Sequence, residues 1–403
     1  MKLRIEKSLP EGDLYAPASK SAAHRALICA GLSDGESVIK NIALSQDIKA
    51  TLSCLEAIGC DIEIQEDTVR IRGVKDLSAV GKTLLECNES GSTLRFFIPI
   101  CLLANARVVL RGSEKLISRP LGVYSEICRK QGIEMTVGKN TVELCGKLKA
   151  DTFEVAGNIS SQFISGLMFA LSQLESDSVI NIIPPFESKP YVYMTADMLE
   201  KFGVKAEIKE NEIKIQGSQK YNHCNLTVEG DWSNAAFLYA LKEYSENLEI
   251  HGVDSDSKQG DKVCIEYFEK LKNGFCTLDV TDCPDLAPIL FAFSAANHGA
   301  KFTGTDRLRL KESDRIACMK EELEKFGAEL LEGKNEVTVN TSGLQKPTQI
   351  ICGHNDHRIV MANAFLLMLT GGEIEGFEAV SKSYPDFFEV MRNSGVKIDY
   401  LNS

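Results

Sequence analysis

The sequence of 403 residues predicts an α/β fold of two lobes, each built from three β-α-β-α-β-β units. The first observation is a repeated signature, in which a short polar segment opens an apolar stretch of helical length. The signature recurs at intervals of roughly 55 to 70 residues, which is typical of repeated structural units. The second observation is that helix-like and strand-like segments alternate behind each opening. The openings begin near Lys20, Ser90, Ser160, Asp231, Asp285 and Asp356.

Each unit is expected to continue in the same order. After the first helix comes a Gly or Asn and then a short β-branched strand, as in residues 35–39 and 372–374. A second helix follows, as in residues 48–58, and Gly59 stands where a helix C-cap needs it. Two strands joined by a tight polar turn close the unit. The same helix, glycine and strand pair are predicted at 194–202, Gly203, 205–208 and 212–215, and at 316–326, Gly327, 328–331 and 336–339.

No Pro- or Ser-rich linker interrupts this spacing, so the chain must cross between the lobes in short segments. We place the crossings near residues 17–20 and 227–230. The predicted first lobe is therefore residues 19–229, and the second is residues 1–18 together with 230–403.

Composition limits the class of protein. A net charge of −12 and a pI near 5.2 disfavour a nucleic-acid partner, because phosphate-backbone binding needs a basic face. The 13 cysteines form no Cys-x-x-Cys pair and indicate reduced thiols in a cytoplasmic protein. The N-terminus lacks a signal-peptide core, and the longest apolar run, residues 96–104, is shorter than the roughly 20 residues of a membrane span.

Helix starts carry unpaired N–H groups and partial positive charge, so several of them aimed at one place predict an anion site. In the first half of the chain, Lys20 and Arg25 supply charge beside the hydroxyls of Ser19 and Ser21. Gly91 would let a ligand approach the backbone closely. The alternative interpretation is a set of ordinary capped helices with solvated cations. Further candidate donors are Arg119, Ser160, Ser161, Gln162, Ser188 and Tyr191.

The second half adds carboxylates to the cations. Residues 307–315 concentrate four cations and two carboxylates, which could also be a solvated helix face. Asp285 could be only an N-cap, or it could act with Glu312 as the paired carboxylates of acid and base steps. His354 and His357 are three apart, but no third metal ligand accompanies them in the sequence, so no metal site is expected. The remaining candidate cations are Lys311, Arg315, Arg358 and Lys382.

Taken together, these segments resemble the 5-enolpyruvylshikimate-3-phosphate synthase family over essentially the whole chain. The resemblance implies a two-domain inverted α/β barrel, enolpyruvyl transferase-like, with the active site in the cleft between the domains. It implies transfer of the enolpyruvyl group of phosphoenolpyruvate to shikimate 3-phosphate in the shikimate pathway, with no metal or organic cofactor. A monomer is expected, with no membrane partner. The motifs that carry it are residues 19–21 with Arg25, 157–163, 189–191, 228–231, 311–315, 355–358 and 382–386.

The resemblance also implies residue roles. Asp285 would take the hydroxyl proton, Glu312 would serve the methylene carbon, and Lys20 would assist the acid chemistry and bind phosphate. Closure of the lobes over both anions is predicted. Shikimate 3-phosphate would be held by Lys20, Ser21, Arg25, Ser160, Ser161, Gln162, Ser188, Tyr191, Asp285 and Lys311. Phosphoenolpyruvate would be held by Lys20, Gly91, Arg119, Gln162, Arg315, Arg358 and Lys382.

The chain departs from the family pattern at Glu89, His24 and Arg307, and a carboxylate at Glu89 would repel phosphoenolpyruvate unless it is paired. One alternative function is the related transferase whose acceptor is a UDP-linked amino sugar. That family commonly depends on a reactive Cys in a mobile loop, and the corresponding residues 111–120 contain none. A second alternative is a non-catalytic anion-binding homologue, which would have no need of both Asp285 and Glu312.

Overall fold

The protein is described by a computed structural model, which covers residues 2–74, 77 and 83–401. The chain forms two compact units. One is Ala18–Glu229, and the other combines the residues up to Pro17 with those from Gly230 onward. Each unit has its own buried apolar core.

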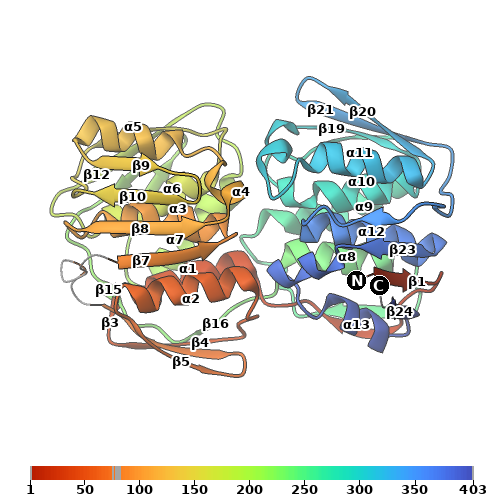
Figure 1. The fold of residues 1–403 in the computed structure, drawn as a ribbon, viewed down its shortest axis with the longest axis horizontal. Helices are drawn as coiled ribbons and strands as arrows, with labels where there is room; N and C mark the ends of the chain where they lie inside the picture. The colour runs from red at the N-terminus through yellow and green to blue at the C-terminus, as the bar shows by residue number, and fades with distance from the viewer. Residues whose placement is uncertain (1, 75–76, 78–82, 402–403) are drawn as a thin grey trace. The chain divides into compact units, whose positions relative to one another are not determined.

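The Ala18–Glu229 unit repeats one sheet pattern three times (Figure 1). In each sheet, two parallel strands lie side by side, and the second of them pairs with an antiparallel hairpin. The three sheets, in spatial order, are β7 (Thr83–Asn88), β8 (Arg107–Gly112), β10 (Thr141–Cys145) and β9 (Glu134–Val137); β11 (Thr152–Ala156), β12 (Ser178–Ile183), β14 (Glu212–Ile215) and β13 (Ala206–Lys209); and β16 (Leu226–Thr227), β4 (Glu36–Lys40), β6 (Thr68–Arg72) and β5 (Asp61–Gln65). Parallel neighbours need a crossover, and one helix supplies it between β7 and β8 and between β11 and β12, whereas β4 and β16 lie near the two ends of the unit's chain.

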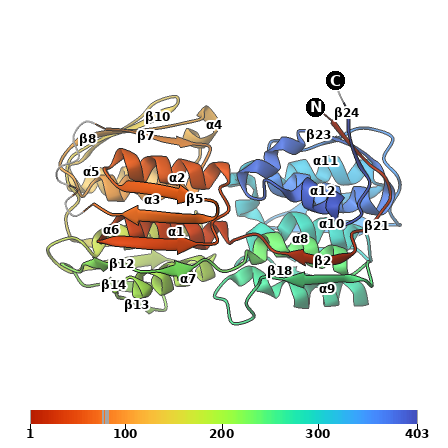
Figure 2. The same ribbon diagram turned by 90° about the horizontal axis from the view of Figure 1, so that it is seen from below.

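Helices fill the interior of this unit. In Figure 2 the sheet with β7, β8 and β10 lies on one side of the helices, and the sheet with β12, β14 and β13 lies on the other. Helices covered on several sides must be apolar nearly all round. This explains why ten of the 11 residues of α3 are buried, and likewise ten of the 11 residues of α6. The helices are α1 (Lys20–Gly31), α2 (Gln46–Ala57), α3 (Gly91–Cys101), α4 (Glu114–Ile117), α5 (Gly122–Gln131), α6 (Ser161–Leu171) and α7 (Lys189–Lys201).

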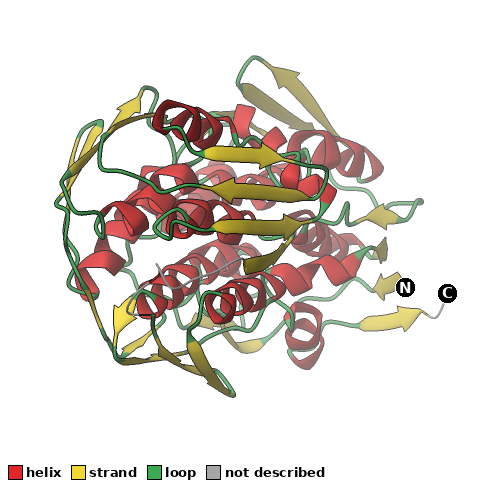
Figure 3. Ribbon diagram, turned by 60° about the vertical axis from the view of Figure 1, so that its left-hand side comes forward, coloured by secondary structure: helices red, strands yellow, loops and turns green. Residues whose placement is uncertain are grey.

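The other unit uses the same sheet pattern twice in the described residues. Where the sequence suggests a third sheet of this kind, β2 (Gly12–Tyr15) pairs only with β17 (Leu248–His251), in parallel. Figure 3 shows the strands of each unit outside its helices. The two sheets are β18 (Thr277–Asp279), β19 (Ala300–Thr303), β21 (Glu336–Thr341) and β20 (Ala328–Gly333); and β22 (Ile351–Cys352), β23 (Gly372–Glu375), β1 (Lys2–Ile5) and β24 (Ile398–Leu401).

The helices of this unit include two that are almost wholly buried, α10 and α12. Short 3-10 helices, labelled η, precede or follow several of them. The helices are α8 (Trp232–Lys242), α9 (Cys264–Asn273), α10 (Ala287–Ala295), α11 (Arg315–Lys325), α12 (His357–Thr370) and α13 (Phe387–Asn393), with η2 (Gly260–Val263), η3 (Pro284–Leu286), η4 (Asp306–Leu310) and η5 (Phe377–Lys382).

The predicted α/β fold of repeated units is confirmed, and so are the local signals on which it rests. Gly59, Gly203 and Gly327 all have positive φ, at 107°, 81° and 83°, where the chain leaves a helix. Five of the six predicted openings carry an N-cap side chain that accepts a hydrogen bond from the first turn. These residues are Ser19, Ser90, Ser160, Asp231 and Asp356.

The sixth opening differs, because Asp285 is not an N-cap. Pro284 and Asp285 lie in the 3-10 turn η3, and α10 begins after it at Ala287 without a capping side chain. The Asp285 carboxylate is therefore available for other contacts. The interpretation of residues 307–315 as a solvated helix face is also wrong, since Arg307 and Arg315 are buried and α11 begins only at Arg315. Among the described residues, no helix is long and apolar enough to span a membrane.

Candidate active site

The buried side chain of Arg25 lies near the starts of α1 and α7. The Arg25 guanidinium lies between α1, α6 and α7, where it donates to Thr195 Oγ1 at 2.8 Å and to the Tyr191 carbonyl at 2.9 Å. It also donates to the Ser21 carbonyl at 2.7 Å. Burial lowers the pKa of Arg25 to about 10, which still leaves it cationic at neutral pH. No described carboxylate forms an ion pair with Arg25, so this buried charge is suited to an anionic ligand.

A second cluster surrounds Gly91, the first residue of α3. A side-chain Cβ built on Gly91 would lie 2.9 Å from Arg119 Nη1, 3.2 Å from Arg95 Nη1 and 3.7 Å from Gln162 Oε1. Arg95 donates to that Gln162 oxygen at 2.7 Å, and Gln162 donates to Ser92 Oγ at 2.9 Å. The structure thus brings the predicted residues Gly91, Arg119 and Gln162 together at a helix start, where the lack of a side chain on Gly91 leaves room for the ends of Arg119 and Arg95.

The other predicted residues of this unit are all at or near helix starts. Lys20 begins α1 and forms an ion pair with Asp47 at 2.9 Å, with both side chains largely buried. Ser160 caps α6, and Ser161 is its first residue. Ser188 is buried with a positive φ of 55° just before α7, to which Tyr191 belongs. His24, one of the departures from the family pattern, is buried and hydrogen-bonds Thr51 at 2.8 Å.

In the second unit, Arg315 is the centre of a carboxylate and cation network. Its guanidinium donates to Asp356 Oδ2 at 3.0 Å, to Asp285 Oδ1 at 2.8 Å and to Glu312 Oε2 at 2.9 Å. Arg315 starts α11, Asp356 caps α12, and Asp285 precedes α10. Two predicted carboxylates, Asp285 and Glu312, are therefore held by the same guanidinium.

Asp285 also contacts two further cations. Lys311 Nζ lies 3.2 Å from its Oδ1, and an Arg358 nitrogen lies 3.5 Å from its Oδ2. Burial by itself would raise the pKa of Asp285, but the charges of Arg358, Lys311 and Arg315 outweigh it and hold the pKa well below its usual range. Burial lowers the pKa of Lys311, although Asp285 opposes this effect. Asp285 is thus ionised at neutral pH, as a proton acceptor must be.

Lys382 completes the predicted set, because its Nζ donates to the Asn355 carbonyl at 2.7 Å, beside Asp356. Arg307, another departure from the family pattern, donates to the Thr281 carbonyl at 2.6 Å. Asp261 is buried close to the network, and its carboxylate accepts a hydrogen bond from the hydroxyl of Ser233. Burial, together with the charge of Asp285, raises the pKa of Asp261 to about 6.

Sequence reasoning missed several contributors to these clusters. Asp356 appears only as a helix cap in the sequence, yet it is a main partner of Arg315. Arg95 and Asp47 lie in the right segments, but their contacts depend on how helices pack together. For His354 the structure supplies partners that its sequence neighbourhood does not, since Glu321 and Glu322 of α11 lie beside its ring.

The model of the family "EPSP synthase (3-phosphoshikimate 1-carboxyvinyltransferase)" matches residues 6–391. A curated 3-phosphoshikimate 1-carboxyvinyltransferase of Clostridium novyi is 39% identical over 430 residues, covering 98% of each chain. One of Clostridium perfringens is 40% identical over 424 residues, again covering 98% of each.

A solved structure of EPSP synthase from Acinetobacter baumannii superposes with a TM-score of 0.80 at 23% identity, covering 99% of each chain, which shows the shared fold. The sequence matches extend along nearly the whole chain. The chain belongs to the EPSP synthase (3-phosphoshikimate 1-carboxyvinyltransferase) family.

Proposed function

We propose that the protein transfers the carboxyvinyl group of phosphoenolpyruvate to the 5-hydroxyl of shikimate 3-phosphate and releases inorganic phosphate. The observation that carries the proposal beyond family membership is the network around Asp285. An ionised carboxylate sits among Arg315, Lys311 and Arg358, where an anionic substrate would meet cations and a hydroxyl group would meet a proton acceptor.

For phosphoenolpyruvate, the proposed contacts are mostly with cations. Its phosphate and carboxylate need several donors, and Arg guanidinium groups provide paired ones. The close approach of Arg119 to Gly91 supports a role of this helix start in binding, since a Cβ on Gly91 would lie 2.9 Å from Arg119 Nη1 and would displace that guanidinium. The full proposed set is Lys20, Gly91, Arg119, Gln162, Arg315, Arg358 and Lys382.

For shikimate 3-phosphate, we assign the binding of the 3-phosphate to the helix starts around Arg25. Helix N-termini bind phosphate through free N–H groups, and Arg25 adds a buried positive charge without a described carboxylate partner. The hydroxyls of Ser21, Ser160, Ser161 and Ser188 supply further donors at these starts. Lys20, Gln162, Tyr191, Asp285 and Lys311 complete the proposed set.

The proposed proton roles follow from the charges. Asp285 accepts the proton of the attacking hydroxyl, Glu312 serves the methylene carbon of phosphoenolpyruvate, and Lys20 assists the acid chemistry and binds phosphate. From the tetrahedral intermediate the two groups exchange roles: Glu312 takes a proton back from the methyl carbon, which re-forms the double bond. The proton held by Asp285 goes to the departing phosphate oxygen as its bond to carbon breaks. The cations that surround the substrate would stabilise the negative charge of the departing phosphate.

The first experiment is phosphate release by the purified protein with phosphoenolpyruvate and shikimate 3-phosphate, beside a parallel reaction with a UDP-linked amino sugar as acceptor. Release only with shikimate 3-phosphate is the expected result. Release only with the sugar would overturn the acceptor assignment, and release with neither would overturn the enzyme proposal. Asp285→Ala should abolish turnover while shikimate 3-phosphate still binds by calorimetry, because the proposed phosphate contacts around Arg25 remain.

A further inference from the structure

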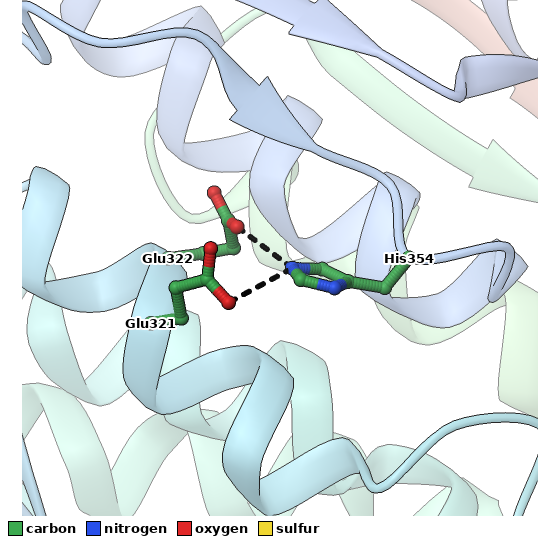
Figure 4. Close-up of side chains that lie close together, drawn as sticks. All are labelled: Glu321, Glu322 and His354. Carbon is green, nitrogen blue, oxygen red and sulfur yellow. Dashed lines mark hydrogen bonds and ion pairs between the residues drawn. The ribbon is translucent and has the colours of Figure 1, made fainter.

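A buried carboxylate lies on α11 outside the network around Asp285. Glu322 is fully buried, and its two oxygens accept from three groups: Lys325 Nζ at 2.9 Å, the Cys352 backbone N–H at 3.1 Å and His354 Nε2 at 2.7 Å. Figure 4 shows the His354 ring pointing at the carboxylates of Glu322 and, at 4.0 Å, Glu321. This cluster joins the second half of α11 to the segment that follows β22.

The cluster is better described as an ion-pair network than as a metal site. Hydrogen bonds with Cys318 and Glu322 raise the pKa of His354 to about 10, so the ring is protonated at neutral pH and has no lone pair to offer a metal. Lys325 already contacts both oxygens of Glu322. Two cations thus balance the charges of Glu321 and Glu322.

The position of Glu322 on α11 relates it to Arg315. The two residues are separated by about two helical turns and so lie on the same face of the helix. From this face, Arg315 holds Asp356 at 3.0 Å, and Glu322 holds His354 at 2.7 Å. The helix α11 therefore holds the segment before α12 through side-chain contacts at two positions, His354 and Asp356.

This segment, residues 354–356, includes two residues in an unfavourable backbone conformation. His354 and Asn355 are consecutive non-glycine residues in the left-handed region, with φ of 49° and 53°. Such residues persist only where their surroundings fix them. This conformation sets the direction of the Asn355 carbonyl, which accepts a hydrogen bond from Lys382 Nζ at 2.7 Å. Asp356 is the next residue in the chain. A side-chain contact that fixes His354 therefore also fixes the Asn355 carbonyl and the Asp356 carboxylate, which contact the proposed phosphoenolpyruvate-binding residues Lys382 and Arg315.

We propose that Glu322 and His354 are positioning residues for the phosphoenolpyruvate site. Their ion pair holds the left-handed turn at 354–355, and the turn sets the Asn355 carbonyl for Lys382 and the Asp356 carboxylate for Arg315. Neither residue touches substrate. The inference rests on the proposed function for the identity of the ligand, whereas the mechanical part, that the ion pair fixes the turn, is independent of it.

The test is His354→Asn. Asn tolerates the left-handed backbone conformation, but it is uncharged and too short to form the ion pair with Glu322. The matched control is His251→Asn, which removes a ring that contacts Asp13 at the same distance of 2.7 Å in the same unit, but on the exposed surface. His354→Lys restores a cation. For each variant we would measure KM for both substrates and the hydrogen exchange of the peptide containing residues 353–358.

The expected result for His354→Asn is a rise of roughly tenfold in KM for phosphoenolpyruvate, with KM for shikimate 3-phosphate changed less than about twofold. Exchange of the 353–358 peptide should quicken, His354→Lys should restore much of both effects, and His251→Asn should show neither. Unchanged exchange would overturn the inference whether or not the protein is active. An equal rise in both KM values would overturn it too. Absence of phosphate release by the unmodified protein would instead reject the proposed function, and the exchange result would still decide the positioning.

Discussion

Arg315 Nε donates to Asp356 Oδ2 at 3.0 Å, and the two side chains are only 1% and 0% exposed. Burial would lower the pKa of Arg315, but the charges of Asp356, Glu312 and Asp285 raise it, so the guanidinium stays charged. Burial would likewise raise the pKa of Asp356, and Arg315 keeps it low. The buried charge of Asp356 is therefore compensated by Arg315, and the buried charge of Arg315 is compensated by three carboxylates, of which Asp356 contributes most.

Asp356→Ala should destabilise the unit that contains it by about 3–5 kcal/mol, since the buried Arg315 loses the carboxylate that compensates most of its charge and α12 loses its N-cap. The measurement is the free energy of unfolding in urea. The control is Asp314→Ala, which removes the cap of α11, a side chain that accepts from Ala317 N at 3.1 Å and is 38% exposed. That loss should cost about 1 kcal/mol. Equal losses in the two variants would contradict the importance of the buried pair.

Gly91→Ala should weaken phosphoenolpyruvate binding without unfolding the protein. The new Cβ would lie 2.9 Å from Arg119 Nη1, the end of a flexible side chain that can move away, so the site changes shape while the core stays intact. KM for phosphoenolpyruvate should rise by about tenfold or more, as expected for loss of a charged hydrogen bond. Gly122→Ala is the matched control, because a Cβ there meets nothing within 4 Å at the start of α5. A KM that is unchanged in Gly91→Ala would remove Gly91 from the site.

Local sequence signals were enough to predict the helices at the openings, three of the second helices and the hairpins that follow those three. Capping side chains such as Ser90 and Asp231, and glycines such as Gly59, act on residues within one turn, so the pattern alone reveals them. The pairing of β2 with β17 without a hairpin could not be predicted, because strand pairing is decided by distant segments.

The site was predictable in its residue types but not in its contacts. The charged residues of 311–315 indicate an anion site, yet the sequence does not show that Arg315 reaches Asp285 and Asp356 from other helices. Asp285 was open to interpretation as a helix cap until the 3-10 turn at Pro284 placed its carboxylate elsewhere. Long-range contacts of this kind depend on tertiary packing, which no single segment encodes.

The pH dependence of turnover should show no acid-side loss from Asp285 above about pH 4, because the cations beside Asp285 hold its pKa well below its usual range. The measurement is kcat/KM from pH 4 to pH 8, with stability checked at each pH. Asp285→Asn should lower kcat by about 10²–10⁴ across the whole range. An acid limb near pH 6 that moves in Asp285→Glu would contradict the assignment of an ionised Asp285 as the base.

The ion pair of His354 with Glu322 should make stability depend on pH on the alkaline side. The folded pKa of His354 is raised from 6.5 to about 10 by its hydrogen bonds with Cys318 and Glu322. A raised pKa means that the folded state binds the proton more tightly, so the stabilisation is fully present below pH 6.5 and is lost as pH rises toward 10. Unfolding in urea should therefore show a difference between the unmodified protein and His354→Asn that is largest near pH 6 and shrinks steadily toward pH 10. Titration of the other groups is common to both proteins and cancels in this difference. His251→Asn, whose ring is exposed, should show no comparable trend. A difference that stays constant between pH 6 and pH 10 would mean that His354 stabilises the turn as a neutral ring rather than as a cation.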